Sequence, residues 1–258
     1  MLVGLCLGAL VVGGCAQTLR ARGVDQSGFL GADYDLLGPG SEQQAQRRYL
    51  RSGVDWAAYR NILLDPVTVW KGKESTGRGI SAENEQMLAN YFYDVIRRAL
   101  EHEGFKLVDS PRPATLLVKV AITKPKESQV ALSVASVVPP LLTVSALDRL
   151  ATGRPAFVGE AQLEVKVTDA LSGELLAAGI DHRVGGKRLD ASMFTSWGDV
   201  EAMMRLWANH GAYELCRLQH RANCVLPPKS RSGRNDAHSP APIAFSKLDR
   251  ASQNASTP

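Results

Sequence analysis

The sequence lacks the short motifs by which common catalytic sites are recognised. It contains no H-E-x-x-H zinc motif and no G-x-S-x-G nucleophile elbow, and His182 and His210 belong to neither. The stretch Gly185-Gly186-Lys187-Arg188 lacks the upstream glycine and the following Ser or Thr of a phosphate-binding loop, so we interpret it as a glycine turn before a basic surface loop. A triad assembled from distant positions would leave no local motif. From these absences we expect a non-enzymatic protein without a cofactor or a resident metal.

An excess of one charge is lacking as well. The chain has 30 Lys and Arg against 26 Asp and Glu, a formal net charge of +4 over 258 residues. These charges are scattered along the sequence, whereas nucleic-acid-binding proteins gather basic residues into a patch or stripe. We therefore expect no nucleic-acid partner.

The N-terminal apolar run, Met1–Gly14, contains no Lys or Arg and is too short for a transmembrane helix, which needs roughly 20 residues. Its length and its small-residue end are typical of a secretory signal. Val12-Gly13-Gly14-Cys15 is similar to a bacterial lipobox, in which the cysteine is acylated after cleavage. We predict a signal peptide over residues 1–14 and lipidation of Cys15; the alternative is a buried first strand or helix. The residue after the cysteine is Ala16 and not Asp, which indicates that the lipoprotein is sorted to the outer membrane.

Composition divides the rest of the chain into three parts. Residues 15–52 are rich in Gly, Gln, Arg and Ser with weak periodicity, which predicts a lipidated N-terminus and a tether between bilayer and domain. Residues 53–226 carry the strand and helix patterns, so we expect a single domain there. Residues 227–258 consist largely of polar residues and Pro without periodicity, which predicts a disordered tail.

The strongest pattern is a hairpin over Phe157–Gly186. Apolar residues at alternate positions from Phe157 to Val167 predict a strand with one buried and one solvent-facing side, where Glu160, Gln162, Glu164 and Lys166 would lie. Ser172-Gly173-Glu174 provides a turn, and Leu175–Arg183 returns as a second strand.

Four further segments complete the predicted fold. Strands are expected over Tyr59–Trp70 and Ala114–Thr123, and amphipathic helices over Ser81–Gly104 and Ser196–Leu218. We expect Ser81 to be the N-cap of the first helix, and Ser196 with Asp199 three residues later resembles a capping box. Asp65 lies before Pro66 inside the first strand; without a partner motif, a bulge or turn carboxylate is favoured over a catalytic acid. The pattern predicts an α+β fold, with a mostly antiparallel or mixed sheet and both helices packed on one face.

The segment Val130–Leu147 contains 18 residues without a charge. Pro139-Pro140 near its middle argues against a continuous membrane-spanning helix, because proline removes backbone donors and clashes with the preceding turn. We favour two buried segments around a bend. The alternative is an interaction segment for a partner or a lipid surface, centred on Val137, Val138, Pro139, Pro140, Leu141 and Leu142.

Two cysteines, Cys216 and Cys224, remain after the signal and the lipidated residue are set aside. In an oxidising compartment this pair predicts a disulfide. Positions eight apart on one helix are about 12 Å apart, so the bond requires the helix to end between them, near Leu218–Arg221. The alternative is a metal site that adds His220, but it lacks a fourth ligand and a known zinc spacing.

Several segments together resemble the domain-of-unknown-function 3313 family of bacterial lipoproteins. They are Gln26-Ser27-Gly28-Phe29-Leu30, Tyr59-Arg60-Asn61 running into Leu64-Asp65-Pro66-Val67, Gly159-Glu160-Ala161 and Ser172-Gly173-Glu174. The resemblance spans residues 26–224 and implies a lipid-anchored periplasmic domain, with no catalytic residues to carry over.

The functional expectation follows from the predicted anchor and the missing motifs. We expect a lipoprotein on the periplasmic face of the outer membrane, with a non-enzymatic accessory role in envelope assembly or transport and an envelope protein as its partner. The alternative is a binding module for an apolar or lipid-like ligand that uses residues 130–147. An enzyme is the third hypothesis. A deep pocket with convergent polar groups would favour the binding module or an enzyme, and a flat apolar edge would favour the accessory role.

Overall fold

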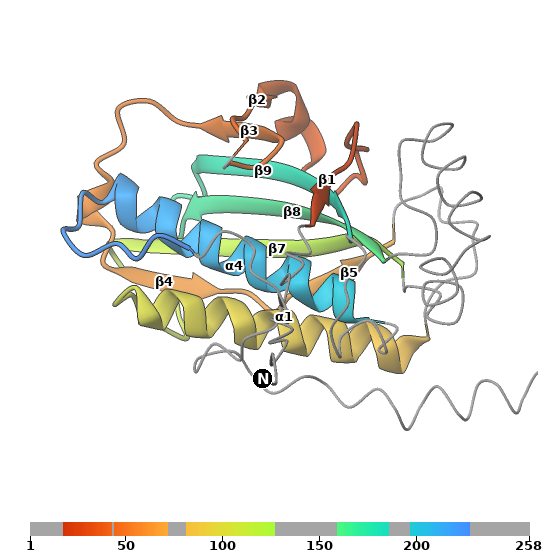
Figure 1. Ribbon diagram of the computed structural model, residues 1–258. Helices are drawn as coiled ribbons and strands as arrows, with labels where there is room; N and C mark the ends of the chain where they lie inside the picture. Colours follow the sequence, from red (N-terminus) through yellow and green to blue (C-terminus); the bar gives the residue numbers. More distant parts are fainter. Residues whose placement is uncertain (1–17, 43, 72–80, 127–158, 186–196, 228–258) are drawn as a thin grey trace, which may run out of the picture.

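The computed structural model of this protein describes residues 18–42, 44–71, 81–126, 159–185 and 197–227. In these residues nine strands form one sheet, and two long helices lie against the same face of it (Figure 1). Cys15, the segment Val130–Leu147 and nearly all of the predicted tail fall outside the described residues. No helix among the described residues is long and apolar enough to span a membrane.

The sheet is mixed. Its strands are β1 (Leu19–Arg20), β2 (Gly38–Pro39), β3 (Arg47–Leu50), β4 (Asn61–Leu64), β5 (Thr68–Trp70), β6 (Lys106–Leu107), β7 (Thr115–Lys126), β8 (Glu160–Asp169) and β9 (Leu175–Val184). The order is β2-β3-β9-β8-β7-β4-β6, with β1 beside β9 and β5 beside β7. β4 runs parallel to β6 and β7, β5 runs parallel to β7, and the other pairs are antiparallel. The fold is α+β, as the sequence predicts.

The predicted hairpin, β8 and β9, lies near the middle of the sheet. Its turn is held by Asp169, whose Oδ1 accepts hydrogen bonds from the backbone N–H groups of Leu171 (2.9 Å) and Ser172 (2.8 Å). Gly173 takes a φ of +73°, a conformation that glycine adopts without steric cost. Short-range turn chemistry therefore sets the register in which β8 and β9 pair.

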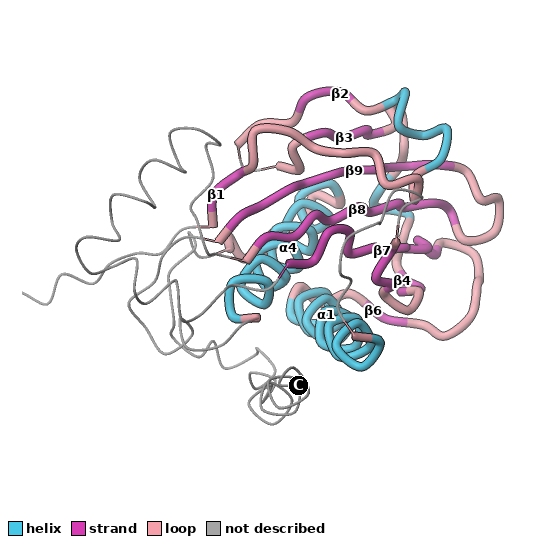
Figure 2. Tube along the Cα trace, turned by 90° about the vertical axis from the view of Figure 1, so that its right-hand side faces the viewer, coloured by secondary structure: helices cyan, strands magenta, loops and turns pink. Residues whose placement is uncertain are grey.

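The two helices are α1 (Ala82–His102) and α4 (Gly198–Leu218), and Figure 2 shows both on the same side of the strands. Ser81 caps α1 as predicted: its Oγ accepts from the backbone N–H of Asn84 at 3.3 Å. The apolar faces of the helices and the strands form the main core, which includes Leu88, Phe92, Val95, Ile62, Leu116, Ile122, Val200, Met203 and Met204.

The start of α4 differs from the sequence expectation of a Ser196/Asp199 capping box. Ser196 lies outside the described residues, and Trp197 stands at the N-cap without a side-chain hydrogen bond to the helix. The Asp199 Oδ2 instead accepts from the backbone N–H of Gly159 at 3.0 Å. This carboxylate therefore joins the beginning of α4 to the beginning of β8.

The predicted interruption at Asp65 is a bulge. Leu64 pairs with Val118 and Thr68 pairs with Ala121, so four steps along β4 and β5 match three steps along β7. The Asp65 carboxylate lies 3.6 Å from Lys119 Nζ on the partly exposed surface. This arrangement fits a bulge carboxylate and not a catalytic acid.

The expectation that residues 15–52 form a tether is wrong for the described part of that segment. Residues 47–50 form β3, which pairs along β9, and Leu19 pairs with Val184 at the other end of β9. A second, smaller core contains Leu30 and Tyr34 from this segment, packed against Ile180 of β9. The segment reads as a tether in sequence because its strands have only two to four residues, too few to show alternation.

The polar side of β8 is also not the solvent-facing side that its alternation predicts. Gln162 and Glu164 are fully buried beneath residues 25–34. Glu164 accepts from Tyr34 Oη at 2.6 Å and from the backbone N–H of Ser27 at 3.2 Å. Gln162 bonds both backbone groups of Asp25, at 2.9 and 2.7 Å. The N-terminal segment therefore satisfies buried polar groups that an exposed face would leave to water.

Candidate apolar binding cleft

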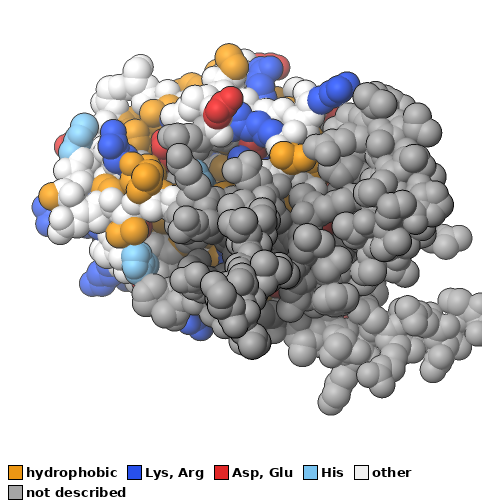
Figure 3. Space-filling model, viewed as in Figure 1, with side chains coloured by type: hydrophobic (Ala, Val, Ile, Leu, Met, Phe, Trp, Pro, Cys, Tyr) orange, Lys and Arg blue, Asp and Glu red, His pale blue; other side chains and the backbone are white. Residues whose placement is uncertain are grey.

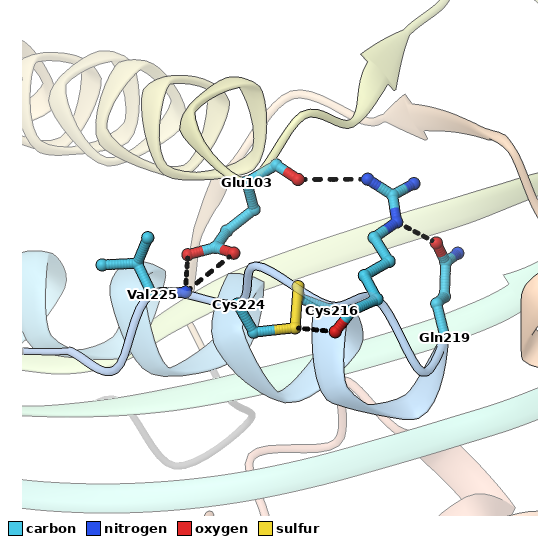
Figure 4. Close-up of a disulfide and its surroundings, with 6 residues drawn as sticks. Glu103, Cys216, Gln219, Cys224 and Val225 are labelled. Atoms are coloured by element: carbon cyan, nitrogen blue, oxygen red, sulfur yellow. Dashed lines mark hydrogen bonds between the residues drawn. A yellow bond between two sulfur atoms is a disulfide. The ribbon is translucent and has the colours of Figure 1, made fainter.

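The disulfide predicted from the sequence is present, and Figure 4 shows its surroundings. Cys216 lies in α4 and Cys224 in the turn after it, with the two Cα atoms 5.7 Å apart. The helix ends at Leu218, within the stretch that the spacing requires. The turn also contacts α1: Val225 donates its backbone N–H to the Glu103 carboxylate at 3.2 and 3.3 Å. The disulfide therefore fixes the chain beyond α4 against the end of α1.

The same cysteines do not make a metal site. Glu103, Cys216 and Cys224 bring possible ligand atoms together, but both sulfur atoms are used by the disulfide and no thiolate is left to bind a cation. His220, the third ligand of the alternative reading, is not a member of this cluster in the described part of the chain. The structure therefore supports the disulfide.

The two histidines considered in the sequence lie on different sides of the sheet. His182 is buried on the face covered by the N-terminal segment, where its Nδ1 lies 3.0 Å from the carbonyl oxygen of Gly23. His210 lines a cleft on the other face, beside α4. The structure does not bring the two together into one site.

This cleft has a volume of about 240 Å³ and lies between α4 and the sheet. Its walls are mainly apolar and come from β3, β7, β8, β9 and both helices, with Leu163, Val165, Trp207 and Leu215 among the residues that line it. Figure 3 shows hydrophobic side chains on this face of the molecule, with basic and histidine side chains among them. A concave apolar site with few polar groups is the usual form of a small-molecule pocket.

Small residues on facing elements create the space. Ala177 and Gly179 line the cleft from β9, and Ala208, Gly211 and Ala212 line it from α4. A Cβ placed on Gly179 would lie 3.2 Å from the Cβ of Ala45, whereas one placed on Gly211 would meet no atom within 4 Å. The space at Gly179 is therefore already taken by Ala45, whereas the small residues Ala177, Ala208, Gly211 and Ala212 fill less of the cleft than larger side chains would.

The buried carboxylate of Asp181 connects β9, on one side of the cleft, to α4 and to the segment that precedes β3. Asp181 of β9 is only 2% exposed, and its Oδ2 accepts from Trp207 Nε1 at 2.7 Å and from Arg183 Nε at 2.5 Å. Its Oδ1 accepts from the backbone N–H of Gln46 at 3.1 Å and lies 3.5 Å from Arg20 Nε. The charge is thus compensated on every side, as a buried carboxylate requires.

The helices are joined to each other behind the cleft. Arg205 Nη1 of α4 donates to Tyr91 Oη of α1 at 2.6 Å, and the rings of Phe92 and Trp207 lie 6.1 Å apart between centroids. Burial raises the pKa of Tyr91, whose phenol oxygen accepts this bond. The two contacts hold α1 and α4 together as one layer.

Sequence reasoning missed this cleft, because its residues come from strands and a helix that are far apart in the chain. Two local signals were present. Ala177 and Gly179 are two apart in a strand, and Ala208 and Ala212 are four apart in a helix, so each pair lies on one face of its element. Only the fold shows that these two faces lie opposite each other.

A family profile described as "Protein of unknown function (DUF3313)" matches residues 25–210. No curated protein matches the chain. Among solved structures, two crystal forms of the PelC dodecamer from Paraburkholderia phytofirmans are similar, with TM-scores of 0.38 and 0.37 at 7% sequence identity. Each match covers 69% of this chain and 97% of the PelC chain.

Proposed function

This chain belongs to the DUF3313 family of proteins of unknown function, and from that premise we propose that it is a non-enzymatic binding module for an apolar, chain-like molecule, tethered to the outer membrane through Cys15. The observation that carries the proposal is the cleft between α4 and the sheet. The residues that line this cleft are all described by the structure. The sequence predicted a different site for an apolar ligand, the segment 130–147.

The size and lining of the cleft support an apolar ligand. Its volume is about 240 Å³, whereas an apolar protein cavity of about 150 Å³ binds benzene. Pockets for drug-sized molecules are larger, about 300 to 1,000 Å³. One aliphatic chain, or part of one, fits these limits better than a bulky polycyclic molecule.

Two charged groups of the cleft, Asp181 and Arg183, are already engaged within the protein. Asp181 and Arg183 bond to each other, and Asp181 also bonds to Trp207, so neither is poised to transfer a proton to a ligand. A general base must lie within hydrogen-bond reach of the proton that it abstracts. Both oxygens of the buried Asp181 carboxylate already accept hydrogen bonds from the protein.

The strand register relates the anchor to the rest of the domain. Leu19, Val184, Glu160 and Lys126 lie side by side in one row across β1, β9, β8 and β7. Adjacent strands are about 4.8 Å apart, so the row spans roughly 14 Å. Leu19 follows Cys15 by four residues, which supports the proposal that this end of the sheet faces the membrane.

The same row supports a second candidate function. Lys126 and Gly159, the residue before Glu160, are the ends of the described chain around residues 127–158, which include the uncharged Val130–Leu147. An envelope protein could therefore meet this segment close to the anchored end of the domain. Under this candidate, Leu142→Asp would abolish partner binding in a crosslinking experiment and leave the melting temperature unchanged.

The binding proposal is tested by blocking the cleft. Ala177 lines it from β9, and a phenylalanine there would project into the space next to Trp207 and Leu215. We expect Ala177→Phe to abolish binding of the fluorescent fatty acid cis-parinarate to the purified protein. The control is Ala57→Phe, at an exposed position that does not line the cleft. Equal binding by both variants would contradict the proposed function.

The anchor is tested separately. Cys15→Ala should abolish metabolic labelling of the protein with a fatty acid and leave the precursor uncleaved, because the acylated thiol is the substrate of the processing step. Labelled, membrane-bound Cys15→Ala protein would contradict the anchor and leave the cleft proposal untouched.

A further inference from the structure

One wall of the cleft carries a cation, the guanidinium of Arg48, that forms no ion pair with any of the residues that the structure describes. Arg48 of β3 is paired with Gly179 of β9, and directly opposed residues of an antiparallel pair point to the same face of the sheet. Both residues line the cleft. Within the described chain, the guanidinium of Arg48 makes no hydrogen bond or ion pair, although its side chain is partly buried.

The opposite wall carries an anion, Glu214, that likewise has no partner in the described part of the chain. Glu214 of α4 lines the cleft, is partly buried, and forms no ion pair or hydrogen bond through its carboxylate to any described residue. Arg48 and Glu214 are thus both at the cleft and do not bond to each other. Charges left partly buried in this way are unfavourable unless something else compensates them.

The two charges stand at a similar height along the cleft. α4 runs antiparallel to β9, since Asp199 approaches Gly185 while Trp207 bonds Asp181. Glu214 lies seven residues beyond Trp207, a rise of about 10 Å. Gly179, the partner of Arg48, lies two residues from Asp181, about 7 Å along the strand. The positions of the cation and the anion therefore differ by less than about one helical turn along the cleft.

The remaining polar groups are already engaged. Arg183 and Asp181 bond to each other, and His210 has an interaction of its own within the protein. The Gln44 side chain accepts from the backbone N–H of Ser41 at 3.3 Å. Of the charged residues that line the cleft, Arg48 and Glu214 are thus the two whose side chains bond to no other described residue, and a ligand could pair with both.

We propose that the cleft recognises a single-chain zwitterionic amphiphile of the lysophosphatidylethanolamine type. This inference rests on the proposed function: the acyl chain occupies the apolar cleft, the phosphate accepts hydrogen bonds from Arg48, and the ammonium group donates to Glu214. A purely anionic head group would leave Glu214 uncompensated and repelling, and a cationic one would do the same to Arg48. The volume of about 240 Å³ admits one chain rather than two.

The test compares three ligands that share a lauroyl chain and differ in the head group. They are lauroyl-lysophosphatidylethanolamine (zwitterionic), lauroyl-lysophosphatidylglycerol (anionic) and monolaurin (neutral), each titrated below its micelle-forming concentration against the purified full chain. We expect the zwitterion to bind about tenfold more tightly than either of the others, the size of one charge-assisted contact.

Two variants give a crossed pattern that a merely structural role would not produce. Arg48→Met should weaken the zwitterion and the anion about tenfold and leave monolaurin unchanged. Glu214→Gln should weaken the zwitterion alone. Arg60→Met is the control, because Arg60 is exposed and does not line the cleft. It should change none of the three affinities.

The outcomes separate this inference from the proposed function. If all three ligands bind equally and neither variant discriminates among them, head-group recognition is wrong and the apolar cleft stands. If the anion binds best and Glu214→Gln has no effect, the zwitterion is wrong. If none of the three binds, or if Ala177→Phe leaves their binding intact, the proposed function and this inference both fall.

Discussion

Trp207 Nε1 donates a 2.7 Å hydrogen bond to the buried carboxylate of Asp181, across the interface between α4 and β9. This bond is a direct polar link between α4, which forms one wall of the cleft, and β9, which forms part of the other. The indole also packs near Phe92 of α1, so one side chain joins α1, α4 and the sheet. The separation that leaves the cleft between α4 and β9 depends on this contact.

Trp207→Phe tests this link. The phenyl ring keeps most of the apolar packing, but the Asp181 carboxylate loses a donor that nothing replaces. We expect the free energy of unfolding, measured with urea, to fall by about 1 to 3 kcal/mol. The control is Trp70→Phe, because Trp70 is 40% exposed and its indole donates to the carbonyl oxygen of Ser27 at 3.2 Å. A loss as large at Trp70 would contradict the importance of the buried bond.

The docking of the N-terminal segment depends on Tyr34. Its hydroxyl donates to Glu164 at 2.6 Å and accepts from the backbone N–H of Gly28 at 2.8 Å. Tyr34→Phe should therefore speed hydrogen exchange of the amides in residues 25–34 and open this segment to limited proteolysis. Tyr49→Phe is the matched control, since Tyr49 packs in the same small core. Unchanged exchange in Tyr34→Phe would show that the polar contacts do not hold the segment.

How much of this fold follows from the sequence depends on the length of each element. The periodicity of α1, α4, β7, β8 and β9 runs over ten residues or more, and their existence is predicted correctly. β1, β2 and β3 have two to four residues, so neither period is visible in them and the segment looks like a tether. Burial of Glu164 is hidden for the same reason, because the segment that covers it was not recognised as structured.

The candidate site was harder to predict than the fold. The disulfide between Cys216 and Cys224 depends on local spacing and compartment, and both are readable in the chain. The cleft depends on small side chains on two facing elements, Ala177 on β9 and Ala212 on α4, and a small side chain on one element leaves a cleft only if the facing element does not fill the space. Arg48 and Glu214 likewise look like ordinary surface charges until the two walls are placed.

Alkaline pH should weaken the fold through Tyr59. Burial raises its pKa to about 12, with a further contribution from its hydrogen bond to Asp169. The unfolded chain, with a tyrosine pKa of about 10, releases this proton at lower pH than the folded chain does. The stabilisation is therefore complete below pH 10 and is lost as pH rises from about 10 toward 12.

Urea unfolding of the wild type and Tyr59→Phe measures this dependence. The free energy of unfolding of the wild type should decline between about pH 10 and about pH 12, and the decline should be shallower in Tyr59→Phe. Because Tyr34 and Tyr91 also have raised pKa values, some decline should remain in the variant. Parallel curves for the two proteins would rule out the contribution of Tyr59.

The disulfide should stabilise the end of the domain. Its short loop predicts a contribution of about 2.5 kcal/mol in the chain-entropy model. The double variant Cys216→Ala, Cys224→Ala should lose about this much free energy of unfolding, and the contact of Val225 with Glu103 should loosen with it. Wild-type protein unfolded in the presence of a dithiol reductant should match the double variant. If the reductant has no effect on the wild type, the bond is not formed in solution.

The most direct test of the central claim locates a bound chain by crosslinking. A fatty acid carrying a diazirine on its alkyl chain is bound to the purified full chain and photolysed, and the modified peptides are identified by mass spectrometry. Crosslinks should fall on the cleft residues Leu163, Val165 and Leu215, and they should disappear in Ala177→Phe but not in Ala57→Phe. Crosslinks confined to other surfaces, or unchanged in Ala177→Phe, would contradict the claim that the space between α4 and the sheet is a binding site.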